Sequence, residues 1–315
     1  MTIADTYREF AIREAHGESP AYERLAHAVS RDDEILTRLA GLPPGKRQPN
    51  LLFAVVRLLG GPVDDPVDDP AAFHDFTVAH WPAVVAQILA RATQTNEVGR
   101  CAALLPVLAT LPGPLALLDV GASAGLCLYP DRYAYRYGDQ LVGSGAPVLD
   151  CAATGVPVPA VPPEVIWRAG MDLNPLDVTD PADVAWLEAL IWPEHTHRRA
   201  RLRAAVAVAQ ADPPLLIRGD LVDDLPALAA RAPADATLVV FHTSVLYQVP
   251  AAGRERFTET VRALPGHWIS VETPDVVGFD SLPAPPDGGL HNVLALDGTP
   301  LAWVRGHGQS ITWFG

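Results

Sequence analysis

The apolar residues follow one period near the N-terminus and another over the rest of the chain. From Ile3 to about Gly60, large apolar side chains recur every three or four residues, which is the period of an amphipathic helix. Ser19 followed by Pro20 is typical of an N-cap and the first residue of a helix. Further helical patterns follow over 71–92. Residues 1–94 are therefore predicted to be an all-helical module.

From residue 95 onward, short apolar runs alternate with helical patterns, and we expect a second domain over 95–315. Such runs are typical of strands buried in a parallel sheet. The predicted strands are Leu115–Asp119, Val165–Met171, Leu215–Arg218, Thr237–Phe241 and His267–Val271. Helices are predicted over Thr95–Leu111 and Ala182–Ile191. The alternation predicts an α/β fold with a doubly wound, mostly parallel sheet.

Two segments depart from this alternation. The tyrosine-rich stretch Tyr129–Tyr137 and the proline-spaced residues after it predict an inserted ribbon at about 129–163. Near the C-terminus, Asn292–Leu296 and Leu301–Arg305 flank Asp297-Gly298, which predicts a terminal antiparallel hairpin. Ser310–Phe314 follows as a possible edge strand.

The most informative motif is LALLDVGASAG at Leu115–Gly125. Its apolar residues end at Asp119, and Gly121 and Gly125 follow at a spacing that lets a strand turn directly into a helix. Glycine at these positions permits a ligand, or the helix, to approach the backbone closely. A dinucleotide fingerprint would require glycines where this chain has Ser123 and Leu126, which argues against NAD.

Further polar residues stand where the predicted fold would bring them to the same edge of the sheet. Asp172 ends the second strand of the domain and Asp220 follows the third. An acid at the end of the second strand accepts hydrogen bonds from ribose hydroxyls in doubly wound folds. Asn96, Glu97 and Arg100 begin the helix that leads into the motif, and they either face a ligand or cap that helix.

This succession resembles class I S-adenosylmethionine-dependent methyltransferases, with their Rossmann-like doubly wound sheet, over roughly residues 96–315. The resemblance implies that Asp119, Gly121 and Gly125 form the first cofactor motif, in which Ser123 replaces the usual middle glycine. It also implies that Asp172 binds the ribose and that Asp220 meets the adenine amino group. The strings TNEVGRCAALLP, LLDVGASAGL, MDLNPLDVTDPADVAWLEALIWPEH and VVFHTSVLYQVP are, in addition, similar to the uncharacterised bacterial domain-of-unknown-function family 2332.

The resemblance implies methyl transfer from S-adenosylmethionine to an oxygen or nitrogen nucleophile of a small-molecule substrate. His242, just past the fourth strand, is a candidate general base because imidazole titrates near neutral pH, and Tyr247 is a candidate for orienting the substrate. Alternatively, His242 only hydrogen-bonds a neighbouring loop. A non-catalytic binding or regulatory protein with the same fold is the alternative function. A serine hydrolase using Ser244 is disfavoured because no GxSxG elbow is present.

The composition of the chain indicates which classes of partner and which cellular location to expect. The net charge of −14, with only 23 Lys and Arg, argues against a nucleic-acid partner. No apolar run is long enough to span a membrane and the first residues do not resemble a signal peptide, so we expect a cytoplasmic protein. No metal is expected: the acidic loop Val63–Pro70 and the segment Glu194–Arg203 are interpreted as solvated. The three separated cysteines, Cys101, Cys127 and Cys151, are predicted to be free thiols.

The helical module has a predicted role of its own. Methyl transfer requires aligned reactants and the exclusion of water, whereas the carboxyl edge of an open sheet is exposed. Because the module leads into the sheet through Asn96–Arg100, we expect it to cover this edge as a lid and to form most of the substrate pocket. Glu97 or Arg100 would then reach the amino-acid end of the cofactor, where a guanidinium would pair with the carboxylate.

Overall fold

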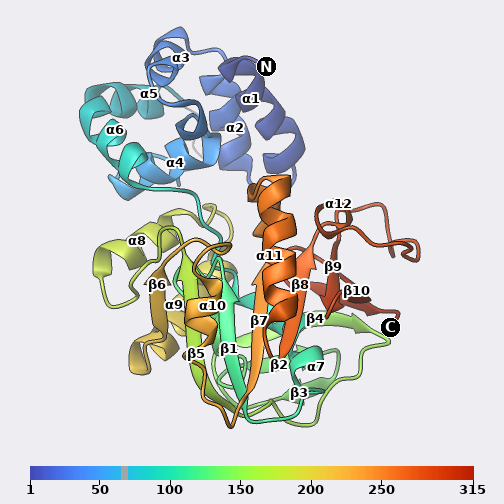
Figure 1. Cartoon of the computed structure of the whole chain (residues 1–315). Coiled ribbons are helices and arrows are strands. Elements are labelled where there is room, and N and C mark those ends of the chain that lie inside the picture. Colours follow the sequence, from blue (N-terminus) through green and yellow to red (C-terminus); the bar gives the residue numbers. More distant parts are fainter. Residues whose placement is uncertain (65–69) are drawn as a thin grey trace. The chain divides into compact units, whose positions relative to one another are not determined.

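The computed structural model describes residues 1–64 and 70–315 (Figure 1). The central part of the predicted acidic loop, 65–69, lies outside the described residues. The chain forms two compact units: Met1–Thr95 with Asp180–Ala200, and Asn96–Thr179 with Arg201–Gly315. Residues 180–200, which the sequence analysis assigned to the α/β domain, thus belong with the N-terminal helices. Among the described residues, no helix has the length and apolar character needed to cross a membrane.

The first unit is helical. Its helices are α1 (Ile3–Phe10), α2 (Pro20–Val29), α3 (Asp33–Ala40), α4 (Pro49–Leu58), α5 (Pro70–Ala79), α6 (Trp81–Ala90) and α8 (Pro181–Ala189). Phe53 of α4 lies at the centre, with edge-on ring contacts to aromatic residues of three other helices. Ser19 caps α2 as predicted, and its hydroxyl donates to Glu194 at 2.6 Å. This contact joins 180–200 to the N-terminal helices.

The second unit is built on one sheet of eleven strands, in the order β3-β2-β4-β11-β10-β9-β8-β7-β1-β5-β6. The strands are β1 (Leu115–Val120), β2 (Ala134–Tyr137), β3 (Gln140–Val142), β4 (Val148–Thr154), β5 (Val165–Asp172), β6 (Leu215–Arg218), β7 (Thr237–Thr243), β8 (His267–Glu272), β9 (Asn292–Leu296), β10 (Thr299–Val304) and β11 (Ser310–Trp313). Its helices are α7 (Cys101–Leu108), α9 (Thr196–Ala211, which begins in the first unit), α10 (Leu225–Ala229), α11 (Ala251–Ala263) and α12 (Pro274–Val277).

The central strand is β1, which pairs in parallel with β5 on one side and β7 on the other. The chain proceeds from β1 through β5 to β6, and then crosses to β7 and β8. The strand order therefore reverses at β1, and ligands of open α/β sheets bind outside the carboxyl ends of the strands at such a reversal. The predicted α/β fold with a mostly parallel sheet is confirmed.

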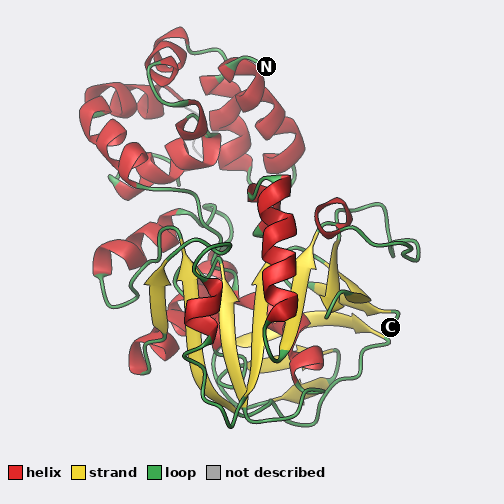
Figure 2. Cartoon of the chain, in the orientation of Figure 1, coloured by secondary structure: helices red, strands yellow, loops and turns green. Residues whose placement is uncertain are grey.

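One face of these parallel strands is covered by α10 and α11, which lie in front of the sheet in Figure 2. The apolar core on this face takes Leu118 and Val120 from β1 and Phe257 and Val261 from α11. The alternate residues of β1, including Asp119, therefore belong to the opposite face. This alternation decides which strand-end side chains can share a site.

The antiparallel part of the sheet begins at β9. Strands β9, β10 and β11 form a meander, and Asp297 and Gly298 both have positive φ in the turn between β9 and β10. The predicted terminal hairpin is thus confirmed. Strand β4 extends the sheet by pairing in parallel with β11. The alternating pattern of β4 was not recognised in the sequence, and neither was the short β3.

Two local predictions were wrong. The motif after β1 does not run into a helix: it is followed by the single 3-10 turn Leu126–Leu128 and then by the ribbon. The helix predicted over Thr95–Leu111 is shorter, because Val98–Arg100 forms a 3-10 turn and α7 begins at Cys101. In place of the predicted helix, the chain after β1 forms an irregular, tyrosine-rich segment.

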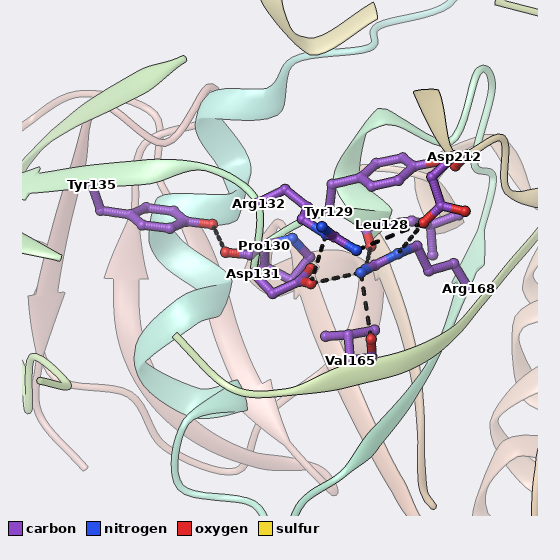
Figure 3. A network of polar contacts seen from close by, with 9 residues as sticks. All are labelled: Leu128, Tyr129, Pro130, Asp131, Arg132, Tyr135, Val165, Arg168 and Asp212. Atoms are coloured by element: carbon purple, nitrogen blue, oxygen red, sulfur yellow. Dashed lines mark hydrogen bonds and ion pairs between the residues drawn. The ribbon is translucent and has the colours of Figure 1, made fainter. Parts of the chain in front are cut away.

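Arg168 of β5 holds that segment in place through several contacts (Figure 3). Its guanidinium donates to the Leu128 carbonyl and to Asp131 Oδ2, both at 2.6 Å, and lies 4.9 Å from the centre of the Tyr129 ring. The Tyr135 hydroxyl donates to the Pro130 carbonyl at 2.6 Å. These contacts satisfy carbonyls that a helix would have paired internally, so an irregular segment can be buried here.

Candidate functional site

The turn that follows β1 lies at the point where the strand order reverses. Asp119 is paired in register with Gly170 of β5 and Phe241 of β7, so it stands between the two neighbouring strands. The turn returns to β5, because the N–H groups of Gly121 and Ala122 both donate to the Met171 carbonyl. We call residues 119–125 the glycine turn.

Both glycines of the turn have positive φ, +76° at Gly121 and +70° at Gly125, and Ser123 between them has φ +51°. A Cβ on Gly121 would lie 2.5 Å from Val245 Cγ2, in the loop after β7. A Cβ on Gly125 would meet Pro214 and Leu216 at 3.1 Å. The glycines are therefore required by close packing of the protein on itself, in addition to any ligand.

This packing yields a stability prediction for Gly121→Ala, with Gly138→Ala as control. Gly138 also has positive φ but nothing lies within 4 Å of a Cβ there, so its substitution should cost about 1–2 kcal/mol of unfolding free energy. Gly121→Ala should cost about 1–3 kcal/mol more because the added methyl overpacks against Val245. Urea unfolding of both variants checks this, and equal losses would refute the packing argument.

Asp172, at the end of β5, organises the turn through both carboxylate oxygens. Oδ2 accepts from the Ser123 N–H and Oδ1 accepts from the Asn174 N–H, each at 2.8 Å. Gly219 N–H donates to the Asp172 carbonyl at 3.0 Å, so the segment after β6 adjoins this strand end. Asp220 is exposed there, and its carboxylate accepts from the Val222 N–H at 2.8 Å.

The residues before α7 reach the same turn. Asn96 Oδ1 accepts from the Leu126 N–H at 3.3 Å. Glu97 is 4% exposed; its carboxylate accepts from the Gly99 N–H and forms an ion pair with Arg201 at 2.8 Å. Glu97 is thus engaged within the protein, whereas Asn96 directly supports the glycine turn.

Arg100 joins two strand ends. Its Nη1 donates to the Thr243 carbonyl at 2.8 Å and to the Thr243 hydroxyl at 3.1 Å, and its Nε donates to the Gly306 carbonyl at 3.0 Å. Within the described residues, Nη2 forms no hydrogen bond. Arg100 therefore has a structural role at the end of β7, and its Nη2 group can still donate a hydrogen bond.

Two buried polar atoms at the glycine turn, the Ser123 hydroxyl and Asn96 Nδ2, have no hydrogen-bond partner in the described part of the chain. The carboxyl group of Asp119 lies in the same turn, and this residue is 5% exposed. Burial, together with Cys127 and Asp172, raises the pKa of Asp119 well above its ordinary value, while Arg100 opposes the shift. Because buried polar groups are normally paired, these atoms indicate a place that a polar ligand or water completes.

Family membership is shown by the sequence match. Residues 4–313 match the family model of an uncharacterized protein conserved in bacteria, DUF2332. The chain belongs to the DUF2332 family. The match runs through both units, so the helices and the sheet are both within the DUF2332 region. No curated protein matches the chain.

In this DUF2332 protein His242 is enclosed and fully paired. It is 0% exposed; Nδ1 lies 2.8 Å from Glu272 Oε1, and Nε2 accepts from Trp268 Nε1 at 3.0 Å. An indole N–H only donates, so Nδ1 carries the proton and no lone pair is left to act as a base. The geometry supports the alternative, in which His242 holds a neighbouring loop.

That loop is held through Glu272 of β8, whose Oε1 also accepts from the N–H groups of Val245 and Leu246 at 2.8 and 3.0 Å. Burial opposes ionisation of Glu272, but the hydrogen bonds that it accepts from His242 and from the two backbone amides together hold its pKa below the ordinary value. Tyr247, in the same loop, is 61% exposed. His242 and Tyr247 are thus not brought together.

The sequence analysis missed one histidine at this edge. His291 precedes β9 and is buried; its Nδ1 lies 2.9 Å from the Gly289 carbonyl, and its Nε2 has no hydrogen bond among the described residues. Asn292, next to it, donates to the Ser244 hydroxyl at 3.0 Å. A histidine directly before an apolar strand was the only sequence feature that could have drawn attention to it. No group of three metal-ligating residues occurs in the described ranges.

Proposed function

We propose that this protein binds S-adenosylmethionine at the glycine turn and transfers its methyl group to an oxygen or nitrogen nucleophile of a small molecule. The observation that carries the proposal is the pair of unpaired buried polar atoms of Asn96 and Ser123, in the same turn as the buried Asp119, at the reversal of strand order. A class I methyltransferase-like fold is part of the proposal. It is supported by the parallel order β6-β5-β1-β7-β8 and by the acids at the ends of β1 and β5.

Each polar residue at the strand ends would bind a different part of the cofactor. Asp119 and Ser123 would accept and donate hydrogen bonds at the amino-acid end of the cofactor. Asp172, whose two oxygens accept from backbone N–H groups of the turn and of the segment after β5, would bind the ribose hydroxyls. Asp220 would meet the adenine amino group. That the helical unit covers this edge stays a prediction.

Thermal unfolding with a ligand panel tests the proposal. S-adenosylmethionine and S-adenosylhomocysteine at millimolar concentration should raise the unfolding temperature, because a ligand that binds only the folded state stabilises it. NADH is the matched control, since Ser123 and Leu126 replace the dinucleotide glycines. Absence of a shift with both sulfur compounds would overturn the proposal.

A second candidate function is binding without turnover. It is supported by the hydrogen bonds that occupy both ring nitrogens of His242, the candidate general base. Stabilisation by S-adenosylmethionine without release of S-adenosylhomocysteine across a panel of hydroxyl and amine metabolites would support this function. Product release with any of them would exclude it.

Arg100→Ala tests the contact with the cofactor carboxylate. We expect S-adenosylhomocysteine to bind more weakly by roughly 1.5–3 kcal/mol, as for other hydrogen bonds to charged groups. Calorimetric titration measures this, with Arg136→Ala, an exposed arginine of β2, as control. Unchanged affinity together with a lower urea midpoint would restrict Arg100 to holding Thr243 and Gly306.

A further inference from the structure

Two buried ring nitrogens in the antiparallel part of the sheet unit, His291 Nε2 and Trp303 Nε1, have no hydrogen-bond partner among the described residues. His291 directly precedes β9 and is 8% exposed, and Trp303 lies in β10 and is 5% exposed. The two rings meet edge to face, with their centres 6.2 Å apart. This spacing is compatible with one oxygen atom that lies about 3 Å from each nitrogen.

Both residues lie at the edge of the sheet that carries the glycine turn. Val293 of β9 is paired with Glu272, at the carboxyl end of β8, and with Trp303 of β10. His291, two residues before Val293, therefore stands just beyond this strand end. Its neighbour Asn292 donates to the loop after β7, which packs against the glycine turn.

The two nitrogens have opposite hydrogen-bonding capacities. His291 Nδ1 lies 2.9 Å from the Gly289 carbonyl, which only accepts, so in the neutral ring Nδ1 carries the proton and Nε2 has the lone pair. The indole N–H of Trp303 only donates. A hydroxyl group satisfies both, since its oxygen accepts from Trp303 and its hydrogen is donated to His291. A protonated amine or a carboxylate would leave one of the two nitrogens unpaired, which is costly in a buried place.

We propose that His291 and Trp303 bind the hydroxyl group of the acceptor substrate, so that the protein methylates a hydroxyl compound and not an amine. This inference rests on the proposed function. The hydroxyl oxygen forms a bond to the methyl carbon, the bond from that carbon to the sulfonium sulfur breaks and leaves its electron pair on sulfur, and the hydroxyl proton passes to His291 Nε2. Asp287 Oδ1, 3.8 Å from Nε2, is too distant for a hydrogen bond, but its charge favours the imidazolium that this step forms.

The chain beside His291 is exposed and irregular. Residues 283–290 are all exposed and belong to no helix or strand. Asp287 holds them in place by accepting from the Gly289 N–H at 2.7 Å and from Arg305 Nη2 at 2.9 Å. Because none of residues 283–290 is buried, we expect local opening of this segment to admit a ligand to Nε2.

Nitrogen NMR of the full-length protein with isotopically labelled histidine tests the site. The probes are benzyl alcohol, benzylamine and benzyl methyl ether, of which only the alcohol both accepts and donates at pH 7. We expect the alcohol to shift the His291 Nε2 resonance in a saturable way, and the amine and the ether to bind about tenfold more weakly because each leaves one buried nitrogen unpaired. His242, with both nitrogens paired, should not respond. Equal responses to the three probes would overturn the proposal, and so would no response, the result expected if a water molecule occupies the site permanently.

Trp303→Phe removes the indole N–H and keeps an aromatic ring. This variant should bind benzyl alcohol about tenfold more weakly and benzylamine as wild type does, and an unchanged His242 resonance reports that it is folded. Trp313→Phe is the matched control, because the Trp313 N–H already donates to the Gly315 carbonyl at 2.9 Å. Wild-type affinity of Trp303→Phe for the alcohol would contradict recognition by this pair.

The probe measurements require no S-adenosylmethionine. If that compound does not bind, the proposed function fails and the methylation step fails with it, while the probes still decide whether the hydroxyl site exists. If S-adenosylmethionine binds and benzyl alcohol does not, the proposed function stands and the inference about the substrate class is wrong.

Discussion

Asp119→Asn should make the protein more stable and at the same time abolish ligand binding. The Asp119 carboxyl is buried, and burial, Cys127 and Asp172 together disfavour its charged form more than Arg100 favours it. An amide of nearly the same shape cannot ionise, and we expect an increase of roughly 0.5–2 kcal/mol in unfolding free energy at pH values above the folded pKa of Asp119, which is the usual size of a stabilising substitution. The ligand would lose its ionic contact.

The pH dependence follows from the direction of the shift. The pKa of Asp119 is raised in the folded state, so the folded protein binds the proton more tightly than the unfolded chain, whose value is near 3.8. Wild type therefore loses stability relative to Asp119→Asn as the pH rises from about this value through the folded pKa. At pH values below about 3.8, wild type and Asp119→Asn should differ little in unfolding free energy. Urea unfolding at several pH values measures the difference.

Asp172→Asn is the matched control, because its two oxygens are occupied by backbone N–H groups. An amide can accept at only one of these positions, so this variant should lose about 1–3 kcal/mol. If Asp119→Asn were instead destabilising by a similar amount, Asp119 would be a structural acid and the interpretation of the glycine turn as a ligand site would lose its main support.

Glu272→Ala should be strongly destabilising. It would leave the ring N–H of His242 and the N–H groups of Val245 and Leu246 without an acceptor in a buried place. We expect a loss of about 3–5 kcal/mol. The loop after β7, which packs against Gly121, should loosen with it.

Urea unfolding distinguishes the contribution of the Glu272 charge from that of its acceptor oxygens. The variants to compare are Glu272→Ala, Glu272→Gln and, as a control, the exposed Glu259→Ala. Glu272→Gln keeps an acceptor oxygen and should lose less. Because the pKa of Glu272 is lowered in the folded state, its ionic contribution is present above the ordinary value of 4.5 and is lost as the pH falls through the folded pKa. Glu272→Gln should lack this acid-dependent loss. Equal stability of all three variants would contradict a stabilising role for the hydrogen bonds that Glu272 accepts.

The parallel strands were predictable because each is a continuous apolar run bounded by polar residues. Leu215–Arg218 and Asn292–Leu296 were predicted to the residue, and Asp172 was correctly placed at the end of β5. The sequence placed Asn96 before the helix that leads into the central strand and left open whether it faces a ligand or caps that helix; in the structure it contacts the turn through Leu126. These features depend on local pattern and on the order of elements along the chain.

The errors concern contacts between residues that are distant in the chain. Thirty residues separate His242 from the Glu272 carboxylate that pairs with it, and nothing in FHTSVLY shows that its side chain faces Trp268. The glycine spacing matched a strand-to-helix turn, yet Arg168 and the buried tyrosines stabilise an irregular segment there. Residues 180–200 joined the helical unit because Glu194 contacts α2, which local periodicity does not encode.

A crystal structure of the complex with S-adenosylhomocysteine tests the central claim most directly. We expect density for the ligand outside the carboxyl ends of β1 and β5, with its amino-acid end against Asp119 and Ser123 and its ribose against Asp172. Density at another place on the sheet, or none at the glycine turn after growth in millimolar ligand, would contradict it.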